Sequence, residues 1–230
     1  MSAIYLIRHG QASFGDGDYD RLSPLGLEQS RVLGEALCGR VPKVDHVVCG
    51  GMTRHRQTAE ACLLAMQLGT AWDEDTGWNE YDHEEVIERF EPRYADPLLL
   101  LDEMKAAADP HRAFQHMFSR AVARWIGGEH DAEYREPWSG FSARVNEALQ
   151  RLVQRMEPSQ TALVFTSGGP ITALATDLLR MPSRDGIRIS WTLANAAVTK
   201  LVVGPRGVHL STLNEHAHFE GARSGLISYR

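Results

Sequence analysis

The sequence predicts an α/β fold with a parallel sheet, and three observations point to it. Runs rich in β-forming residues occur at 4–7, 44–49 and 161–166. Each run is followed within a few residues by glycine, and a stretch with helical spacing comes next along the chain. Short apolar runs that stop at glycine are typical of buried strands in parallel sheets. The repeated order of strand, turn and helix predicts the α/β fold class.

Length and composition fit a single domain spanning residues 1–230. With 43% hydrophobic and 23% charged residues, the core should be large enough to need no disulfide or structural metal. The net charge of −6 does not suggest a nucleic-acid partner. The three cysteines, Cys38, Cys49 and Cys62, are odd in number and lack metal-ligand spacing, which fits a reducing compartment.

The N-terminus lacks the pattern of a signal peptide, and no apolar run approaches the length needed to span a membrane. We therefore expect a cytoplasmic protein that does not act at a membrane.

The first strand ends in Arg8, His9 and Gly10, which form the first candidate site. Parallel sheets bind ligands at the carboxyl ends of their strands. An imidazole nitrogen there can attack phosphorus, and a guanidinium can bind two oxygens of one phosphate. Gly10 lets the backbone turn away and leaves room for the ligand. The alternative from these residues alone is a surface Arg-His pair in a turn.

The next elements follow from turn and capping residues. A loop rich in Gly and Asp covers 12–21, and Ser23-Pro24 then predicts the start of a helix that ends near Gly39. The strand at 44–49 is followed by a helix over 52–68, closed by Gly69.

Arg54 lies near the start of this second helix, just after a strand. Backbone N–H groups and the helix dipole favour an anion at that place. We therefore expect Arg54 to add a bidentate clamp for an anion there. The alternative is a solvated cationic side chain, which describes Arg56 better than Arg54.

Glu80 lies in the sequence Trp-Asn-Glu-Tyr, among aromatic and amide side chains that favour partial burial. Partial burial raises the pKa of a carboxyl group and makes it a usable general acid near neutral pH. The following acidic residues, Asp82, Glu84 and Glu85, are better explained as the start of a helix.

Residues 84–138 form a helical stretch interrupted by prolines and without a strand pattern. We expect it to be an insertion that covers the carboxyl edge of the sheet as a lid. Four arginines in it either contact an anionic substrate or lie on solvated helix faces: Arg112, Arg120, Arg124 and Arg135.

The second half of the chain repeats the strand, turn and helix order. An amphipathic helix at 139–156 precedes the strand at 161–166, and the turn Ser167-Gly168-Gly169-Pro170 then leads into a helix over 171–180. This turn is an anion-binding arrangement, with Ser167 placed to meet a phosphate.

Segments 195–203 and 208–213 flank a Gly-Pro-Arg-Gly turn and predict a hairpin, so one edge of the sheet should be antiparallel. His216 and His218 follow it, but a third metal ligand is not evident, and rim histidines are the simpler interpretation.

The chain resembles the histidine phosphatase superfamily, also called phosphoglycerate mutase-like, in four motifs taken together. These are RHGQ after the first strand, LSPLG and RHRQTA at the two helix starts, and TSGGPI at the late strand and its turn. The resemblance extends to about Val203. It implies a three-layer α/β sandwich with helices on both faces of a mostly parallel six-stranded sheet, and the insertion at 84–138. It also implies a two-step phosphoryl transfer that uses no metal and no cofactor.

By motif position, the resemblance makes His9 the nucleophile and Glu80 the acid that protonates the leaving oxygen. Arg8 and Arg54 would clamp the phosphoryl group, and Ser167 and Gly168 would complete the phosphate-binding turn. The implied partner is a small phosphorylated substrate or inorganic phosphate.

Two residues depart from the family pattern. Ser167 stands where the family has a second histidine that donates to the phosphoryl oxygens, and loss of one such donor costs about 2–4 kcal/mol of barrier. Gly15 stands where the family tends to have asparagine. His55 and His83 are candidates to replace the missing histidine.

Three functions follow from this pattern. The first is a phosphomonoester hydrolase that works through phospho-His9. The second, motivated by Ser167, is a protein that binds a phosphoester with little or no turnover. A mutase ranks lowest, since the catalytic set is incomplete. The sequence leaves the substrate open, and an exposed apolar edge would be compatible with a homodimer.

Overall fold

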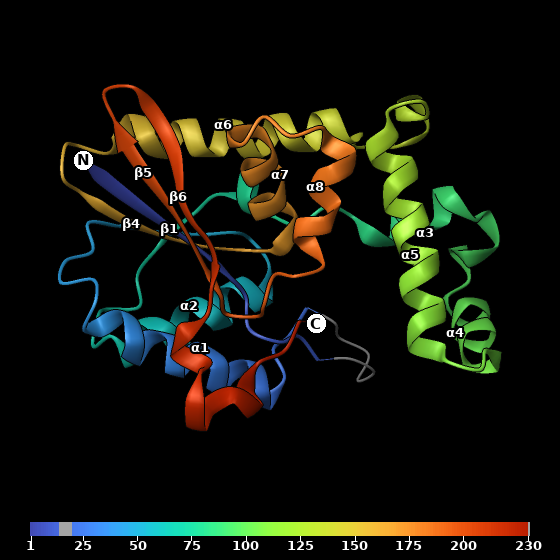
Figure 1. The fold of residues 1–230 in the computed structure, drawn as a ribbon, viewed down its shortest axis with the longest axis horizontal. Helices are drawn as coiled ribbons and strands as arrows, with labels where there is room; N and C mark the ends of the chain where they lie inside the picture. The colour runs from blue at the N-terminus through green and yellow to red at the C-terminus, as the bar shows by residue number, and fades with distance from the viewer. Residues whose placement is uncertain (14–19, 230) are drawn as a thin grey trace.

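The computed structural model describes residues 1–13 and 20–229, and in this part of the chain a central sheet has helices on both faces (Figure 1). The strand order is β3-β2-β4-β1-β5-β6. The strands are β1 (Ser2–Arg8), β2 (His46–Cys49), β3 (Asp73–Glu74), β4 (Thr161–Thr166), β5 (Val198–Gly204) and β6 (Gly207–Glu215). The α/β sandwich predicted from the sequence is therefore confirmed.

The sheet is mixed. Strands β3, β2, β4 and β1 are parallel to one another, whereas β5 pairs antiparallel with both β1 and β6. The sequence predicted a mostly parallel sheet, whereas the observed sheet is mixed because β5 and β6 form an antiparallel hairpin at one side. The Gly-Pro-Arg-Gly turn predicted this hairpin. Arg8 pairs with Thr166, and Cys49 pairs with Phe165. The turns after β1, β2 and β4 consequently begin at one edge of the sheet.

Helices separate into two layers because the strand side chains alternate between the two faces. Ile7 and Phe165 pack with α1 and α2, while Leu6 and Val164 pack with α6 and α7 on the other face. In Figure 1, α1 and α2 lie below the sheet and α6 and α7 lie above it. The helices are α1 (Pro24–Cys38), α2 (Thr53–Ala65), α3 (His83–Phe90), α4 (Pro97–Ala106), α5 (Pro110–Gly127), α6 (Trp138–Arg155), α7 (Gly168–Leu178) and α8 (Ser183–Ser190).

Local backbone and capping contacts explain where α1 begins and where α1 and α2 end. The Ser23 hydroxyl accepts the N–H of Gly26 at 3.1 Å, and α1 stops before Gly39, as predicted. The predicted end of α2 at Leu68 was wrong. Gln67 takes a left-handed φ of 59°, and the N–H of Leu68 turns back to Leu63 O at 3.0 Å, so this helix closes at Ala65.

Between α2 and α6 the chain is largely helical. It contains η1 (Thr76–Trp78), α3, η2 (Pro92–Ala95), α4, α5 and η3 (Asp131–Glu133), and α3 to α5 lie to one side of the sheet in Figure 1. Prolines start α4 and α5, with Asp96 and Asp109 as N-caps that accept backbone N–H groups. Phe118, Val122 and Trp125 anchor α5 to the core under α6 and α7.

The turn after β1 packs directly on α1. A Cβ added to Gly10 would lie 2.3 Å from Gly26 O, and one added to Gly26 would lie 2.1 Å from Gln11 O. Glycine at both positions lets the two backbones touch and fixes the direction in which the chain leaves β1.

None of the helices in the described ranges, 1–13 and 20–229, has the length and apolar character needed to cross a membrane.

Two neighbouring leucines on α2 provide a matched test of the core. The side chain of Leu63 is fully buried between α1 and the sheet, whereas that of Leu64 is 60% exposed. We expect Leu63→Ala to lower the free energy of unfolding by about 2–5 kcal/mol because it leaves a cavity. Leu64→Ala should change it by less than about 0.5 kcal/mol. Urea unfolding of both variants tests this, and equal losses would contradict the assigned helix face.

Candidate active site

The candidate site lies at the edge of the sheet where β1, β2 and β4 end. The N–H of His9 donates to Thr166 O at 2.9 Å, and the N–H of Gly50 donates to Phe165 O at 3.0 Å. These bonds extend the parallel pairing by one residue beyond the strands. The residues that follow, including Ser167, are therefore neighbours in space.

His9 is held as a neutral imidazole. Its Nδ1 lies 2.7 Å from the carbonyl oxygen of Gly10, and because a carbonyl only accepts, Nδ1 must carry the proton. Burial, at 6% exposure, lowers the pKa of His9 well below its usual value, and the charges of Arg54, Arg8 and His55 lower it further. The lone pair of this ring is therefore on Nε2.

Arg8 is anchored by backbone carbonyls from the C-terminal third of the chain. Its Nη1 donates to Leu193 O and, at 3.3 Å, to Tyr229 O. A Cβ placed on Gly168 would lie 3.6 Å from Arg8 Nε, so the guanidinium lies against the turn after β4. These contacts fix the guanidinium beside the first turn of α7.

Arg54 is buried in the first turn of α2 and is paired with Asp20. Its Nη1 lies 2.8 Å from Asp20 Oδ1, and the N–H of Thr53 donates to Asp20 Oδ2 at 2.8 Å. The carboxylate of Asp20 thus occupies the helix N-terminus that the sequence assigned to a ligand anion. It compensates the charge of Arg54, which burial would otherwise make costly.

Glu80 lies against the N-terminus of α7. Its carboxylate accepts the N–H of Gly169 at 3.0 Å and that of Tyr81 at 3.2 Å. A Cβ on Gly169 would be 1.9 Å from Glu80 Oε1, so a side chain there would displace the carboxylate of Glu80 from its present position. Burial raises the pKa of Glu80, although the Gly169 N–H and the charges of Arg54 and Arg8 oppose this. The carboxyl group is therefore shifted toward the protonated form that a general acid needs.

Ser167 is the last residue before α7 and is fully buried. Its Oγ lies 2.6 Å from Nε2 of His55, a buried histidine in the first turn of α2. The ring centroids of His55 and His9 are 5.9 Å apart. The structure thus brings an imidazole next to the serine that follows β4.

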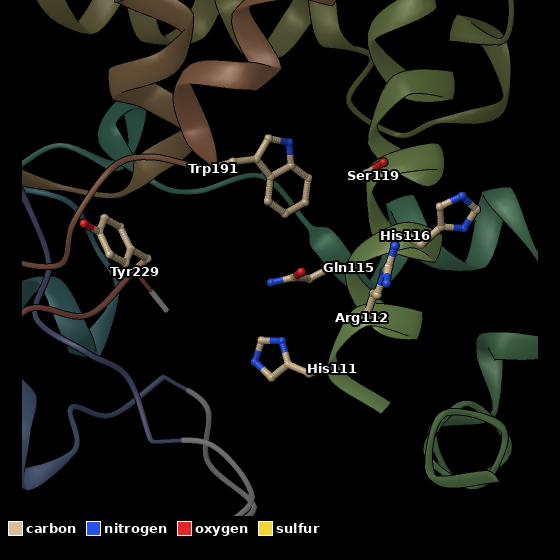
Figure 2. Close-up of a pocket in the computed structure, with 7 residues that line it drawn as sticks. All are labelled: His111, Arg112, Gln115, His116, Ser119, Trp191 and Tyr229. Carbon is tan, nitrogen blue, oxygen red and sulfur yellow. The ribbon is translucent and has the colours of Figure 1, made fainter. Parts of the chain in front are cut away.

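A cavity of about 660 Å³ lies between α5 and the segment around Trp191 and Tyr229. Figure 2 shows side chains of α5 and the two aromatic rings on opposite sides of this space. The carbonyl of Tyr229, one of the lining residues, also accepts a hydrogen bond from Arg8. The lining residues are His111, Arg112, Gln115, His116, Ser119, Trp191 and Tyr229.

Only one of the four arginines proposed as substrate contacts lines this cavity, namely Arg112. Arg120 lies over the ring of Phe90, with 5.2 Å from its Cζ to the ring centroid. The other two are bound within the helical segment: Arg124 to Glu133 and Tyr134, and Arg135 to Asp82 and Glu85. For these three, the interpretation as structural or solvated cations is the better one.

The sequence also singled out His83, His216 and His218. His83 is the first residue of α3. His216 and His218 bind backbone carbonyls of Asn214 and Ala196 at 2.6 and 3.1 Å. Across residues 1–13 and 20–229, the His, Cys, Asp and Glu side chains form no group of three suited to a metal ion. Gly15, the second departure from the family pattern, lies outside the described residues.

The sequence matches the model of the histidine phosphatase superfamily (branch 1) over residues 4–216, which is nearly the whole chain. This chain belongs to the histidine phosphatase superfamily. The region matched includes all four site residues assigned from motif positions, His9, Arg8, Arg54 and Glu80.

Among curated relatives, the mitochondrial serine/threonine-protein phosphatase PGAM5 of Xenopus laevis is 26% identical over 207 residues. This alignment includes 89% of the present chain but 61% of the relative, so the chain spans about three fifths of the length of that phosphatase.

Two solved structures share the fold. A mutant phosphoserine phosphatase from Entamoeba histolytica in complex with phosphoserine has a TM-score of 0.64 at 14% identity, with 95% of this chain and 99% of that chain covered. Phosphoglycerate mutase from Bacillus anthracis has a TM-score of 0.64 at 17% identity, with 97% and 96% covered. The histidine phosphatase fold thus accounts for almost all of the chain.

Three contacts of the candidate site have no local signal in the sequence. Asp20 was only one acidic residue of a loop, yet it pairs with Arg54. The carbonyls of Leu193 and Tyr229 bind Arg8 and carry no side-chain chemistry that a motif would record. The double glycine after Ser167 was a usable signal, since Gly169 donates its N–H to Glu80.

The raised pKa of Glu80 predicts a pH-dependent effect of Glu80→Gln. A carboxyl group whose folded pKa is above its unfolded value supports folding below the unfolded pKa, and this contribution is lost as pH rises through the folded pKa. Relative to the wild type, Glu80→Gln should therefore gain free energy of unfolding between pH 4 and pH 8. Urea unfolding across this range tests the shift. A constant difference, or one that favours the wild type more at high pH, would contradict it.

Proposed function

We propose that this protein is a metal-independent phosphomonoester hydrolase that works through a phosphohistidine on His9. The observation that carries the proposal is the bond from Nδ1 of His9 to Gly10 O, which leaves the Nε2 lone pair of a neutral ring as the nucleophile. Arg8 and Arg54 lie close enough to lower the pKa of His9 by their charge. The family membership and the phosphatase names of the relatives support the same reaction class.

In the first step, Nε2 of His9 attacks phosphorus and the bond from phosphorus to the ester oxygen breaks. Glu80 gives its proton to that oxygen, and an alcohol leaves. The guanidinium groups of Arg8 and Arg54 hold the phosphoryl oxygens, and Gly168 at the turn after β4 gives them space. The raised pKa of Glu80 suits this role, because it keeps a larger fraction of the carboxyl protonated.

In the second step, Glu80, now a carboxylate, takes a proton from water while the water oxygen attacks phosphorus. The bond from phosphorus to Nε2 breaks, inorganic phosphate leaves, and both His9 and Glu80 return to their starting states. The N–H groups of Gly169 and Tyr81 hold the carboxylate in place between the two steps.

We further propose that residues 84–138 act as a lid within a single domain and contribute to substrate choice. The cavity is lined on one side by polar side chains of α5 and on the other by Trp191 and by Tyr229, whose carbonyl binds Arg8. It would receive the part of the substrate beyond the phosphoryl group. Since Arg112 and two histidines line it, a small, polar or anionic phosphoester fits better than an apolar one.

A second candidate function is a protein that binds a phosphoester and turns it over slowly. The observation in its favour is Ser167, which follows β4 where the family has a histidine and which carries no positive charge. This candidate predicts bound phosphate without a phosphohistidine, and a gain in rate on Ser167→His.

Replacement of the nucleophile tests the hydrolase. We expect His9→Ala to lower phosphate release from a panel of small phosphomonoesters on the order of a thousandfold or more, because no other group attacks phosphorus. The matched control is His46→Ala. His46 lies at the opposite end of β2, where its Nε2 contacts Gln160 at 2.8 Å, so its loss should leave the rate within about twofold. Equal rates in the wild type and His9→Ala would refute the mechanism.

A further inference from the structure

His55 is a buried titratable group that the steps above do not use. Its side chain has 0% exposure, and Nε2 lies 2.6 Å from the hydroxyl of Ser167. A Cβ on Gly50 would lie 2.3 Å from Nδ1, so the backbone of the turn after β2 closes the other side of the ring. The imidazole is therefore packed between the turns that follow β2 and β4.

Within residues 1–13 and 20–229, the charged groups that act on this ring are cationic. Burial lowers the pKa of His55 most, and the charges of Arg54 and Arg56 on its own helix lower it further, while the Gly50 backbone acts in the opposite direction. His9 faces it from the end of β1 with a neutral ring. Without a ligand, His55 is consequently neutral.

The bond between His55 and Ser167 has two possible directions, because the hydroxyl has a single proton. If Ser167 donates to Nε2, its proton is used within the pair. If Nε2–H donates to Ser167 Oγ instead, the hydroxyl proton is available to an external acceptor. A dianion beside Arg8 and Arg54 selects the second direction, since it accepts the hydroxyl proton and stabilises a charged imidazole.

We propose that His55 and Ser167 form one donor unit of the phosphoryl site: when a phosphoryl dianion binds, His55 takes up a proton from solvent, donates Nε2–H to Ser167, and Ser167 donates its hydroxyl to a phosphoryl oxygen. Ser167 touches the substrate, and His55 is a positioning residue that supplies positive charge through it. The catalytic part of this proposal rests on the hydrolase function, whereas the proton uptake on binding does not.

Calorimetry with tungstate tests the proton uptake without turnover. Tungstate is a tetrahedral dianion near neutral pH, and titrations in two buffers of different ionisation enthalpy count the protons taken up. We expect the wild type to take up nearly one proton more than His55→Gln. Ser167→Ala should behave like His55→Gln, because the ring then loses its link to the anion. Equal uptake in the wild type and His55→Gln would overturn the proposal.

Two controls separate His55 from other groups. Glu80→Gln removes the other acid of the site. In its background, the protein with His55 should still take up nearly one proton more on tungstate binding than the protein with His55→Gln. His46→Gln should take up the same number of protons as the wild type. Thermal unfolding followed by circular dichroism checks that each variant is folded. A merely structural His55 would alter stability and leave the proton count unchanged.

Kinetics test the unit in the reaction. We expect Ser167→Ala and His55→Gln each to lower kcat/KM by about a hundredfold, as for loss of one donor to a developing charge. The double variant should lose no more than Ser167→Ala, because the two residues act as one unit. If the fall in kcat/KM of the double variant equals the product of the two single falls, the proposal is overturned.

Transfer of the imidazole provides a gain-of-function test. His55→Ala combined with Ser167→His moves the ring from α2 to the turn after β4, and it should recover kcat/KM to within about tenfold of the wild type. If the wild type forms no phosphohistidine yet shows the proton uptake, the hydrolase function fails and the donor unit stands. If hydrolysis runs and the uptake difference is absent, the donor unit fails and the hydrolase stands.

Discussion

The in-register pairing of β1 with β4 is the constraint on which the site depends. Because Arg8 pairs with Thr166, His9 and Ser167 leave the sheet at the same level. The pairing of β2 with β4 adds the turn that carries the chain into α2 and hence Arg54 and His55. A shift of the strand register by one residue would move these side chains to the opposite face of the sheet, so they would no longer lie together.

The charged groups of the candidate site act on one another. Burial and, after it, the charges of Arg54 and Arg8 lower the pKa of His9, and Asp20 compensates Arg54 from the side of the α2 N-terminus. Glu80 is partly buried and bound by two backbone N–H groups, so its position is fixed whether or not it is charged. A lowered pKa for the nucleophile His9 and a raised pKa for the acid Glu80 shift both groups toward the protonation states that the proposed first step needs.

Local sequence patterns predicted the parts of this fold whose causes are local. Ser23-Pro24 starts α1, Asp82 starts α3, and the run at 161–166 is a strand, because each depends on capping or periodicity within a few residues. Weak patterns were missed: β3 is two exposed acidic residues, and α8 has a single buried residue. The site followed the same rule, since Arg8, His9, Arg54 and Glu80 lie in recognisable local motifs.

Contacts between segments far apart in the chain could not be predicted from local sequence patterns. Arg54 and Asp20 are 34 residues apart, His55 and Ser167 are 112 apart, and Arg8 meets the carbonyl of Tyr229 across 221 residues. Such pairs arise from the register of the sheet and from the path of the C-terminal segment over the site. They leave no periodic or capping signal at either residue.

The transient bond between His9 and phosphorus is the central claim, and rapid-quench trapping tests it most directly. Protein mixed with a ³²P-labelled phosphomonoester and quenched in base within milliseconds should carry label that is stable in base and lost in acid, as expected for a phosphoramidate. Peptide mapping should place this label on His9, and His9→Ala should carry none. Turnover with no labelled protein at any time, or label on another residue, would contradict the account.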